Sequence, residues 1–394
     1  MKRSLLFLAI LSLTAGAQVS AADLSWGDPT LDSGQFKVSG AVRSRYLHKD
    51  YVVGANEGSQ NDDWRLTDIK LVLGYENPDW IAGLDTRCYQ YNRLCDAIFL
   101  KKAWAGYKLS DQQRVTVGLQ PVDFGFGEFW GSSYYETLLN TVGLEDIDNL
   151  GIKYKFSDDK YNLTLGFYPS DGGNYKGTSK DSSRYSGNFV EADDLSNGTN
   201  IEEKNMWIGR ASRKFEIDKA QNFSTELGGS FWYSDLENKR TNIDGHRKSW
   251  NVFAQTQYQA WQWMFLAGKQ DVTNGDDLFP NSSTIGAFDY PYQVANKGKY
   301  LVNEINYTFA QPFHQLTNIK PYISHSRFFK AEDGYKDSER LIAGVYFNYK
   351  AIGIQGEYIM SKNDPMIGGG TNGLAQGSSN DWDKLFYLSI GYYF

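Results

Sequence analysis

The chain has 394 residues, of which 15% are aromatic and 39 are glycine, while only 9 are proline. This composition is typical of strands and tight turns, and the length fits one large barrel as well as two ordinary domains. The net charge of −7 argues against a nucleic-acid-binding protein, because phosphate contacts need a basic face. Hydrophobic residues at 41% exclude a disordered chain, and past the N-terminus no apolar run is long enough for a membrane-spanning helix.

The N-terminus has the pattern of an export signal. Lys2 and Arg3 precede an apolar stretch, and small residues around position 21 offer a cleavage site. We therefore predict that residues 1–22 form a signal peptide and that residues 23–394 form the mature domain.

The chain contains two cysteines, Cys88 and Cys95, and no histidine lies near them in the sequence, so a zinc site is not predicted. In the oxidising compartment that export implies, the two cysteines are a candidate disulfide, with two free thiols as the alternative. The four histidines are scattered without a metal-binding spacing. We predict neither a metal nor a cofactor.

Sixteen segments alternate apolar and polar residues with the period of a β-strand. Near the start of the mature chain, for example, Phe36 and Val42 share one face, while Arg43 and Arg45 belong to the other. The sixteen predicted strands are 35–47, 64–75, 80–88, 97–108, 113–120, 149–156, 160–169, 204–217, 222–234, 248–259, 262–270, 299–309, 317–328, 340–350, 352–361 and 384–394.

The connections between these strands alternate between short and long. Turns such as 157–159 and 218–221 are short, whereas connections such as 121–148 and 170–203 run to twenty residues or more. This alternation is typical of outer-membrane barrels, which have short periplasmic turns and long external loops. Sixteen strands enclose a lumen too wide for side chains to fill, so the polar face should line water and the apolar face should contact lipid.

The sequence therefore predicts an all-β fold, a closed antiparallel transmembrane β-barrel of about sixteen strands in the outer membrane of a Gram-negative bacterium. Aromatic residues near the strand ends suit the two belts that such barrels place at the membrane surfaces: Tyr46, Trp64, Trp80, Trp207, Trp250, Trp261 and Trp263.

The last segment, residues 385–394, resembles the terminal strand of Gram-negative outer-membrane proteins and includes Tyr392 and Phe394. Residues 99–125 resemble the strand pair that leads into the pore-constricting third loop of porins, and residues 151–154 resemble the strand that follows it. This resemblance implies that Phe394 and Tyr392 belong to the signal read by the barrel-assembly machinery. It also implies a homotrimer in the outer-membrane lipid and a third long loop folded into the lumen.

The third long connection is the candidate constriction. It contains no Lys or Arg and six acidic residues, which are Asp123, Glu128, Glu136, Glu145, Asp146 and Asp148. The inward strand positions carry more basic than acidic residues: Lys37, Arg43, Arg45, Lys70, Arg87, Lys102, Arg114, Lys153, Lys155, Arg210, Lys320 and Arg340, against Asp68, Asp85, Glu226, Glu304 and Glu357. We expect the acidic loop to face the basic wall across a narrow gap, and the resulting field to favour charged solutes. The alternative is that these charges simply solvate a wet lumen.

The same loop is rich in aromatic side chains, for which two interpretations are open. Phe129, Trp130, Tyr134 and Tyr135 could stack on sugar rings, or they could pin the loop to the barrel wall. A folded-in loop needs apolar anchors, which favours pinning.

These features predict a channel for passive diffusion of small hydrophilic solutes or ions, and not an enzyme, since no nucleophile-elbow motif occurs. The basic wall favours anions such as small carboxylates or phosphate, although the acidic loop opposes that preference. The alternatives are a carbohydrate-selective channel, or a barrel that acts as a surface receptor or adhesin through the loops 170–203 and 271–298.

Overall fold

The computed structural model describes residues 24–51, 62–91, 93–173, 184–191, 198–288, 290–309 and 313–394. The predicted signal peptide lies outside these residues. No helix in the described part of the chain has the length and apolar character needed to cross a membrane.

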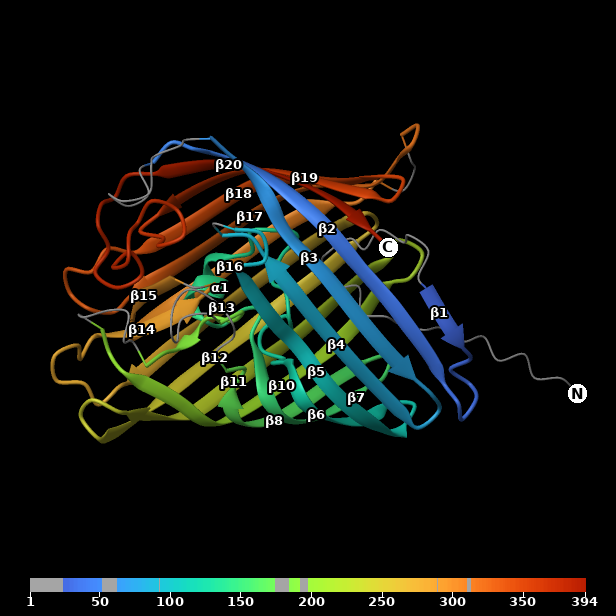
Figure 1. The fold of residues 1–394 in the computed structure, drawn as a ribbon, viewed down its shortest axis with the longest axis horizontal. Coiled ribbons are helices and arrows are strands. Elements are labelled where there is room, and N and C mark those ends of the chain that lie inside the picture. The colour runs from blue at the N-terminus through green and yellow to red at the C-terminus, as the bar shows by residue number, and fades with distance from the viewer. Residues whose placement is uncertain are drawn as a thin grey trace, which may run out of the picture.

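Sixteen long strands form one closed antiparallel barrel, as predicted (Figure 1). Each of the sixteen predicted segments matches one of them to within a few residues, because a strand with one wet face keeps a strict period of two. The strands are β2 (Gln35–Lys49), β3 (Asp62–Glu76), β4 (Trp80–Tyr89), β5 (Ala97–Ser110), β6 (Gln113–Pro121), β7 (Asp148–Ser157), β8 (Tyr161–Asp171), β10 (Ile201–Asp218), β11 (Phe223–Asn238), β12 (Ile243–Tyr258), β13 (Trp261–Thr273), β16 (Lys297–Tyr307), β17 (Leu316–Lys330), β18 (Ser338–Tyr349), β19 (Ile352–Lys362) and β20 (Asp383–Tyr393).

The barrel closes where β2 pairs with β20. Gly40 and Phe394 exchange two backbone hydrogen bonds there, with N···O distances of 2.8 and 3.1 Å, so the terminal residue of the chain is part of the seam. A short strand, β1 (Leu24–Gly27), adds to the free part of β2. Closure leaves no long unpaired strand edge for the hydrocarbon of a bilayer to meet.

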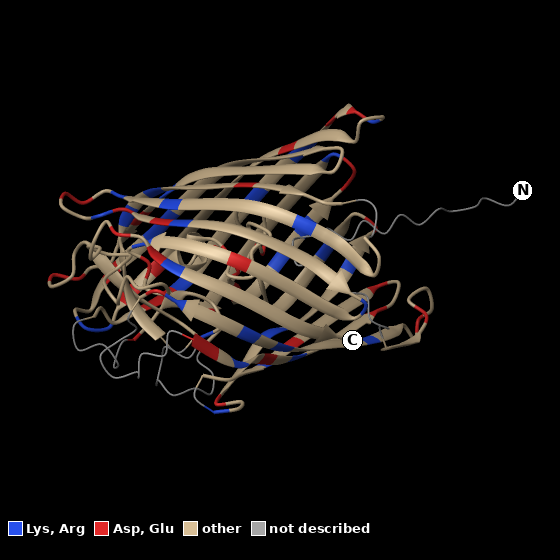
Figure 2. Cartoon of the chain, turned by 90° about the horizontal axis from the view of Figure 1, so that it is seen from above, with Lys and Arg blue, Asp and Glu red and all other residues tan. Residues whose placement is uncertain are grey.

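The long connections build elements that the alternation did not predict. A helix, α1 (Leu138–Val142), lies inside the barrel (Figure 1). A small sheet forms from β9 (Asn188–Phe189), β14 (Ser282–Ala287) and β15 (Tyr290–Ala295). It belongs to the end of the barrel with the long loops, where acidic and basic residues are mixed (Figure 2). These strands are short, and two of them pair across different loops. The sequence around them therefore has no alternation that would predict them.

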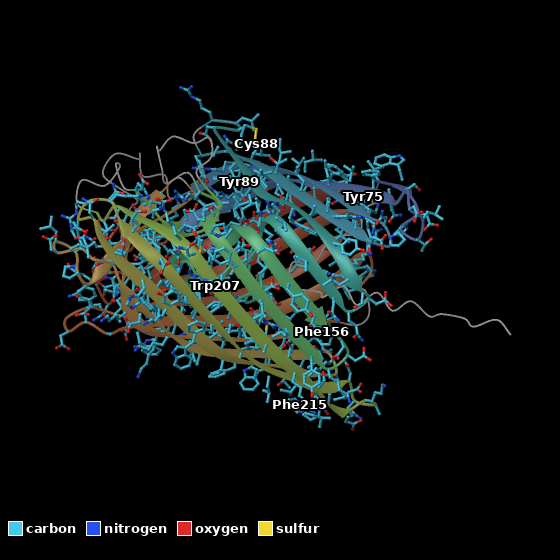
Figure 3. The ribbon with its side chains drawn as sticks, turned by 90° about the horizontal axis from the view of Figure 1, so that it is seen from below. Tyr75, Cys88, Tyr89, Phe156, Trp207 and Phe215 are labelled. Atoms are coloured by element: carbon cyan, nitrogen blue, oxygen red, sulfur yellow. A yellow bond between two sulfur atoms is a disulfide. The ribbon has the colours of Figure 1, made fainter. Side chains whose placement is uncertain are left out.

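The outer face of the barrel is apolar. Trp207 and Phe215, on the outward side of β10, are 57% and 39% exposed (Figure 3). The other tryptophans predicted for the aromatic belts are also exposed: Trp64, Trp80, Trp250, Trp261 and Trp263. Such a surface is costly in water and suited to lipid.

The interior corrects one expectation. We expected a polar inner wall all round, but the inward face of β11 to β17 carries large apolar side chains that pack against the third loop. Trp232 and Leu266 are fully buried in this cluster. Both faces of these strands are therefore apolar in part. The alternation of side chains along a strand does not show that a loop covers its inner face. Further members from the wall are Phe253, Met264, Tyr300, Val302 and Phe328.

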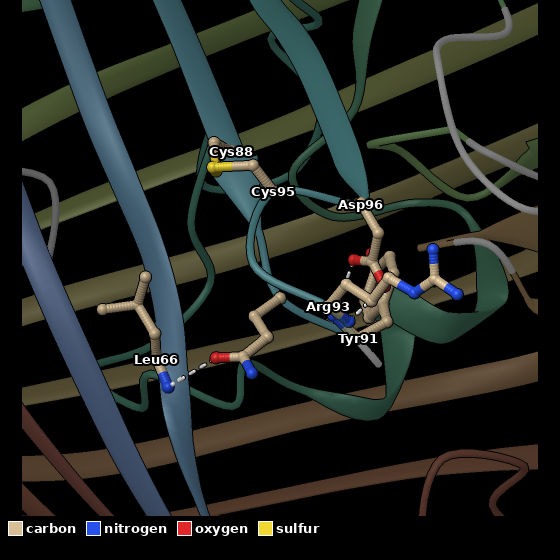
Figure 4. The surroundings of a disulfide bond; sticks show 7 residues. Leu66, Cys88, Tyr91, Arg93, Cys95 and Asp96 are labelled. Atoms are coloured by element: carbon tan, nitrogen blue, oxygen red, sulfur yellow. Dashed lines mark hydrogen bonds between the residues drawn. A yellow bond between two sulfur atoms is a disulfide. The ribbon is translucent and has the colours of Figure 1, made fainter.

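Cys88 and Cys95 form a disulfide that closes the short connection between β4 and β5 (Figure 4). Asp96 supports the same connection, because its carboxylate accepts hydrogen bonds from the backbone N–H groups of Tyr91 and Arg93 at 2.9 and 2.8 Å. The turn is thus held by one covalent bond and one carboxylate.

Candidate functional site

The third loop, residues 122–147, leaves β6, crosses the barrel interior and returns to β7. Its tip reaches the opposite wall, where the backbone N–H and hydroxyl of Ser132 donate to Glu304 on β16 at 2.8 and 2.6 Å. The N–H of Tyr134 donates to Glu357 on β19 at 2.9 Å. A Cβ on Gly131 would lie 2.5 Å from a carboxylate oxygen of Glu304, so glycine is what lets the tip approach this closely.

A buried arginine of the wall fixes the next part of the loop. The guanidinium of Arg340 on β18 donates to three successive loop carbonyls, those of residues 135, 136 and 137, at 3.0–3.3 Å. It also donates to Asp364 at 2.8 and 2.6 Å. Thr137, whose carbonyl is the third of these, is also the N-cap of α1, and Gly143 ends the helix in the left-handed conformation. Sequence reasoning placed Arg340 on the inner wall but did not find this role.

Lys101 on β5 is the most enclosed cation of the site. Its ammonium lies 2.8 Å from Glu128, 2.7 Å from Asp146 and 3.8 Å from Asp148, and its side chain has no exposed surface. The rings of Phe129 and Tyr185 lie 5.1 and 4.6 Å from the ammonium, within cation–π range. We call this set of five residues around Lys101 the Lys101 cage.

Sequence reasoning missed Lys101 because of a β-bulge. Asp85 on β4 pairs with Lys102, whereas Thr86 pairs with Leu100, so Lys101 is an extra residue in β5. A bulge resets the alternation of side chains, and two consecutive lysines then face the lumen. A strict period of two that points Lys102 inward leaves Lys101 on the other face, so Lys101 was not among the predicted site residues. The available signal was the pair of consecutive lysines in one strand.

The acidic residues of the third loop contact the barrel wall directly. The prediction of a narrow gap between the acidic loop and the basic wall is wrong for these residues. Lys102 lies 2.6 Å from Glu128, and Asp123 lies 3.1 Å from Lys153 and 3.7 Å from Lys155. The ion pairs fasten both ends of the loop to β5 and β7. Opposite charges in contact largely cancel, so they do not produce the expected field across an open gap.

Two further loop acids are buried within the loop itself. Glu145 accepts the N–H of Trp130 at 2.7 Å and the N–H of Thr137 at 3.1 Å, and burial raises the pKa of Glu145 to about 7. The carboxyl of Glu136 hydrogen-bonds that of Asp146, and burial followed by the charge of Asp146 raises the pKa of Glu136 well above its usual value. A proton kept by Glu136 therefore reduces the negative charge that the loop carries at neutral pH.

The predicted basic residues fall into two groups. Arg43 forms a two-point pair with Asp68 at 2.7 and 2.5 Å, and Arg87 forms one with Asp85 at 3.1 and 3.0 Å. In contrast, four inward basic residues have no carboxylate within 4.0 Å in the part of the chain that the structure describes: Lys37, Arg45, Arg114 and Lys320. Lys37 and Arg114 are exposed and lie near the short turns.

The aromatic side chains of the loop mostly pin it. Trp130 is fully buried, and its indole N–H donates to the carbonyls of Phe124 and Gly127 at 3.2 and 3.1 Å. It has no face open to a sugar ring, so the stacking interpretation is wrong for Trp130. Tyr134 stacks on Tyr387 of β20 with ring centroids 5.3 Å apart, and the guanidinium of Arg43 covers it at 4.9 Å. Tyr135 contacts the same Tyr387, and Phe129 belongs to the Lys101 cage.

Glu128, Asp146 and Asp148 place carboxylate oxygens within 4.8 Å of one another, a spacing that would suit a metal ion. The ammonium of Lys101 lies among these oxygens. The positive charge that a cation would bring is already supplied by the protein.

Comparisons with known proteins agree with the barrel fold. The model of the family "phosphate-selective porin O and P" matches residues 82–263, which include β5, the third loop and β7. This chain is a porin. It lies in the outer membrane of a Gram-negative bacterium, and its barrel forms a channel. The search of curated proteins finds no match.

Solved structures share the barrel of this porin at low sequence identity. The outer-membrane channel DcaP of Acinetobacter baumannii is 11% identical with a TM-score of 0.61, over 93% of this chain and 99% of that one. OmpF of Salmonella typhi, in complex with daunomycin, is 13% identical with a TM-score of 0.60, over 94% and 100%. The anion-selective porin of Comamonas acidovorans is 11% identical with a TM-score of 0.54, over 91% and 99%. At these identities the likeness concerns the fold.

Proposed function

We propose that this porin passes small anions in preference to cations. The observation that carries the proposal is that the acids at the third loop are paired or buried, whereas four basic residues of the inner wall have no acidic partner in the part of the chain that the structure describes. Every acid of the third loop contacts a lysine, a backbone N–H or another carboxyl, and the wall acids Glu304 and Glu357 are buried beneath the loop tip, whose N–H groups they accept. The basic residues without an acidic partner, such as Arg45 and Arg114, are then the charges that a passing ion meets.

The family match and one structural neighbour support the same direction. The matched family is described as phosphate-selective, and the Comamonas acidovorans porin is described as anion-selective. Small carboxylates and phosphate are the solute classes that guanidinium groups bind best, because two parallel N–H groups match two oxygens.

The test is the reversal potential of the purified mature porin in a planar lipid bilayer under a potassium chloride gradient. We expect stepwise conductance. The reversal potential should have the sign of the chloride equilibrium potential. A potential set by potassium would contradict the anion preference while leaving the channel intact. A folded barrel without conductance would favour the alternative of a surface receptor.

We also propose that the channel works as a homotrimer in outer-membrane lipid after residues 1–22 are removed. In this proposal Tyr392 and Phe394 guide the assembly of the barrel. The channel catalyses no reaction. The apolar outer face supports the contact with lipid, and the place of Phe394 in the closing seam supports its part in assembly. One structural neighbour, OmpT of Vibrio cholerae, is described in a trimer form. Chemical cross-linking of the detergent-extracted protein should give a ladder that ends at three subunits.

A further inference from the structure

The bulge in β5 gives two adjacent lysines different surroundings. The side chain of Lys101 has no exposed surface, whereas that of Lys102 is 20% exposed. Lys102 contacts one carboxylate, that of Glu128, while Lys101 contacts three. The two residues therefore contribute the same formal charge in very different ways.

The acids of the Lys101 cage depend on Lys101 unequally. Glu128 would keep Lys102 if Lys101 were lost. Asp146 and Asp148 would have no cationic partner within 4.0 Å in the described part of the chain. Both oxygens of Asp148 are buried and accept no hydrogen bond, so Lys101 is the group that offsets this carboxylate. Tyr185 donates to Asp146 at 3.0 Å, but a neutral hydroxyl does not cancel its charge.

The position of these acids makes their charge important for passing ions. They lie where the third loop meets the wall, and the field of an enclosed charge is screened less by salt than that of an exposed one. Carboxylates that lose their counter-charge at a constriction attract cations and repel anions wherever they stay ionised.

We propose that Lys101 is a positioning residue that determines ion selectivity, because it neutralises the carboxylates of the constriction and keeps the third loop against β5. The proposal rests on the anion preference proposed above. Lys101 itself is enclosed and does not touch the ion; it acts through Glu128, Asp146 and Asp148.

The test compares reversal potentials of three proteins under one salt gradient: the mature porin, Lys101→Met, and Lys101→Met combined with Asp146→Asn and Asp148→Asn. We expect Lys101→Met to shift the potential toward potassium and to reverse its sign. The combined variant should return to the sign of the unchanged porin, because the two carboxylates no longer need a counter-charge. If Lys101 served packing alone, the combined variant would behave like the single one, and that result would overturn the proposal.

Two control variants are compared with Lys101→Met for their shift in reversal potential. Lys102→Met should weaken the anion preference without reversing it, because Glu128 keeps Lys101. Lys219→Met, in an exposed turn, should leave the potential unchanged. If Lys101→Met does not fold, as judged by heat-modifiable migration on a gel, the combined variant decides: a folded, anion-preferring barrel supports the proposal, and an unfolded or cation-preferring one overturns it.

The two proposals fail in different ways. A cation-preferring unchanged porin contradicts the proposed function. The difference between that porin and Lys101→Met tests Lys101 in either case, because losing a counter-charge moves the potential toward potassium from any starting value. An unchanged potential in a folded Lys101→Met protein overturns the inference.

Discussion

At the scale of single residues, burial and partners decide what a charge does, and sequence alternation shows neither. Arg43 and Arg45 are two residues apart on β2 and face the same side, so the sequence treats them alike. In the structure Arg43 is buried against Asp68, whereas Arg45 is partly exposed and has no acidic partner within the described residues. The first is a structural pair of the wall, and the second is a charge available to ions.

This difference predicts opposite results for matched substitutions. Arg43→Met leaves the carboxylate of Asp68 buried and unpaired, which should lower the free energy of unfolding by about 3 kcal/mol. Arg45→Met should leave stability within about 0.5 kcal/mol and weaken the anion preference, because it removes a free charge. Urea unfolding in detergent and reversal potentials measure the two effects. Equal losses of stability in both variants would contradict the assignment.

At the scale of elements, the strands were predictable and the folded loops were not. Each barrel strand has lipid on one side, and this enforces a period of two that the sequence displays. The sheet of β9, β14 and β15 pairs loops that are far apart in the chain, and α1 is five residues long, so neither leaves a local pattern. The position of the third loop was implied by resemblance, but its contacts depend on a bulge and on wall acids that accept its N–H groups.

The buried carboxyl of Glu145 makes the third loop sensitive to pH. Burial raises its pKa from 4.5 to about 7, so between these values the unfolded chain loses the proton while the folded loop keeps it. The free energy of unfolding should therefore fall as pH rises from about 4.5 to 7, by at most about 3 kcal/mol for this group, and level off above that range.

Unfolding midpoints between pH 4.5 and 8 measure this dependence, and Glu145→Gln provides the comparison. The variant should show a shallower fall by the contribution of one proton, with a remaining slope from Glu136, whose pKa is also raised. Identical slopes in the two proteins would show that Glu145 does not hold a proton in the folded loop.

At the scale of the whole molecule, the interior is divided along the barrel axis. Toward the long loops, the third loop, β14 and β15 bury apolar side chains such as Trp130, Ile285 and Tyr292 in one hydrophobic cluster with the inner wall. Toward the short turns, the inner wall exposes basic residues such as Lys37 and Arg114. The strand count and closure followed from the sequence, but this division did not, because it depends on which inner surfaces the loops cover.

The uneven interior makes the channel electrically one-sided. Exposed basic residues of the inner wall at the turn end attract anions, whereas buried apolar side chains line the loop end. The two directions of current therefore start from regions with different local ion concentrations. Such a pore rectifies: at equal salt on both sides, the current at a given voltage should differ when the voltage is reversed. Neutralising Lys37 and Arg114 together should make the current–voltage curve more symmetrical, and an equal asymmetry in the variant would place the charge that governs conduction elsewhere.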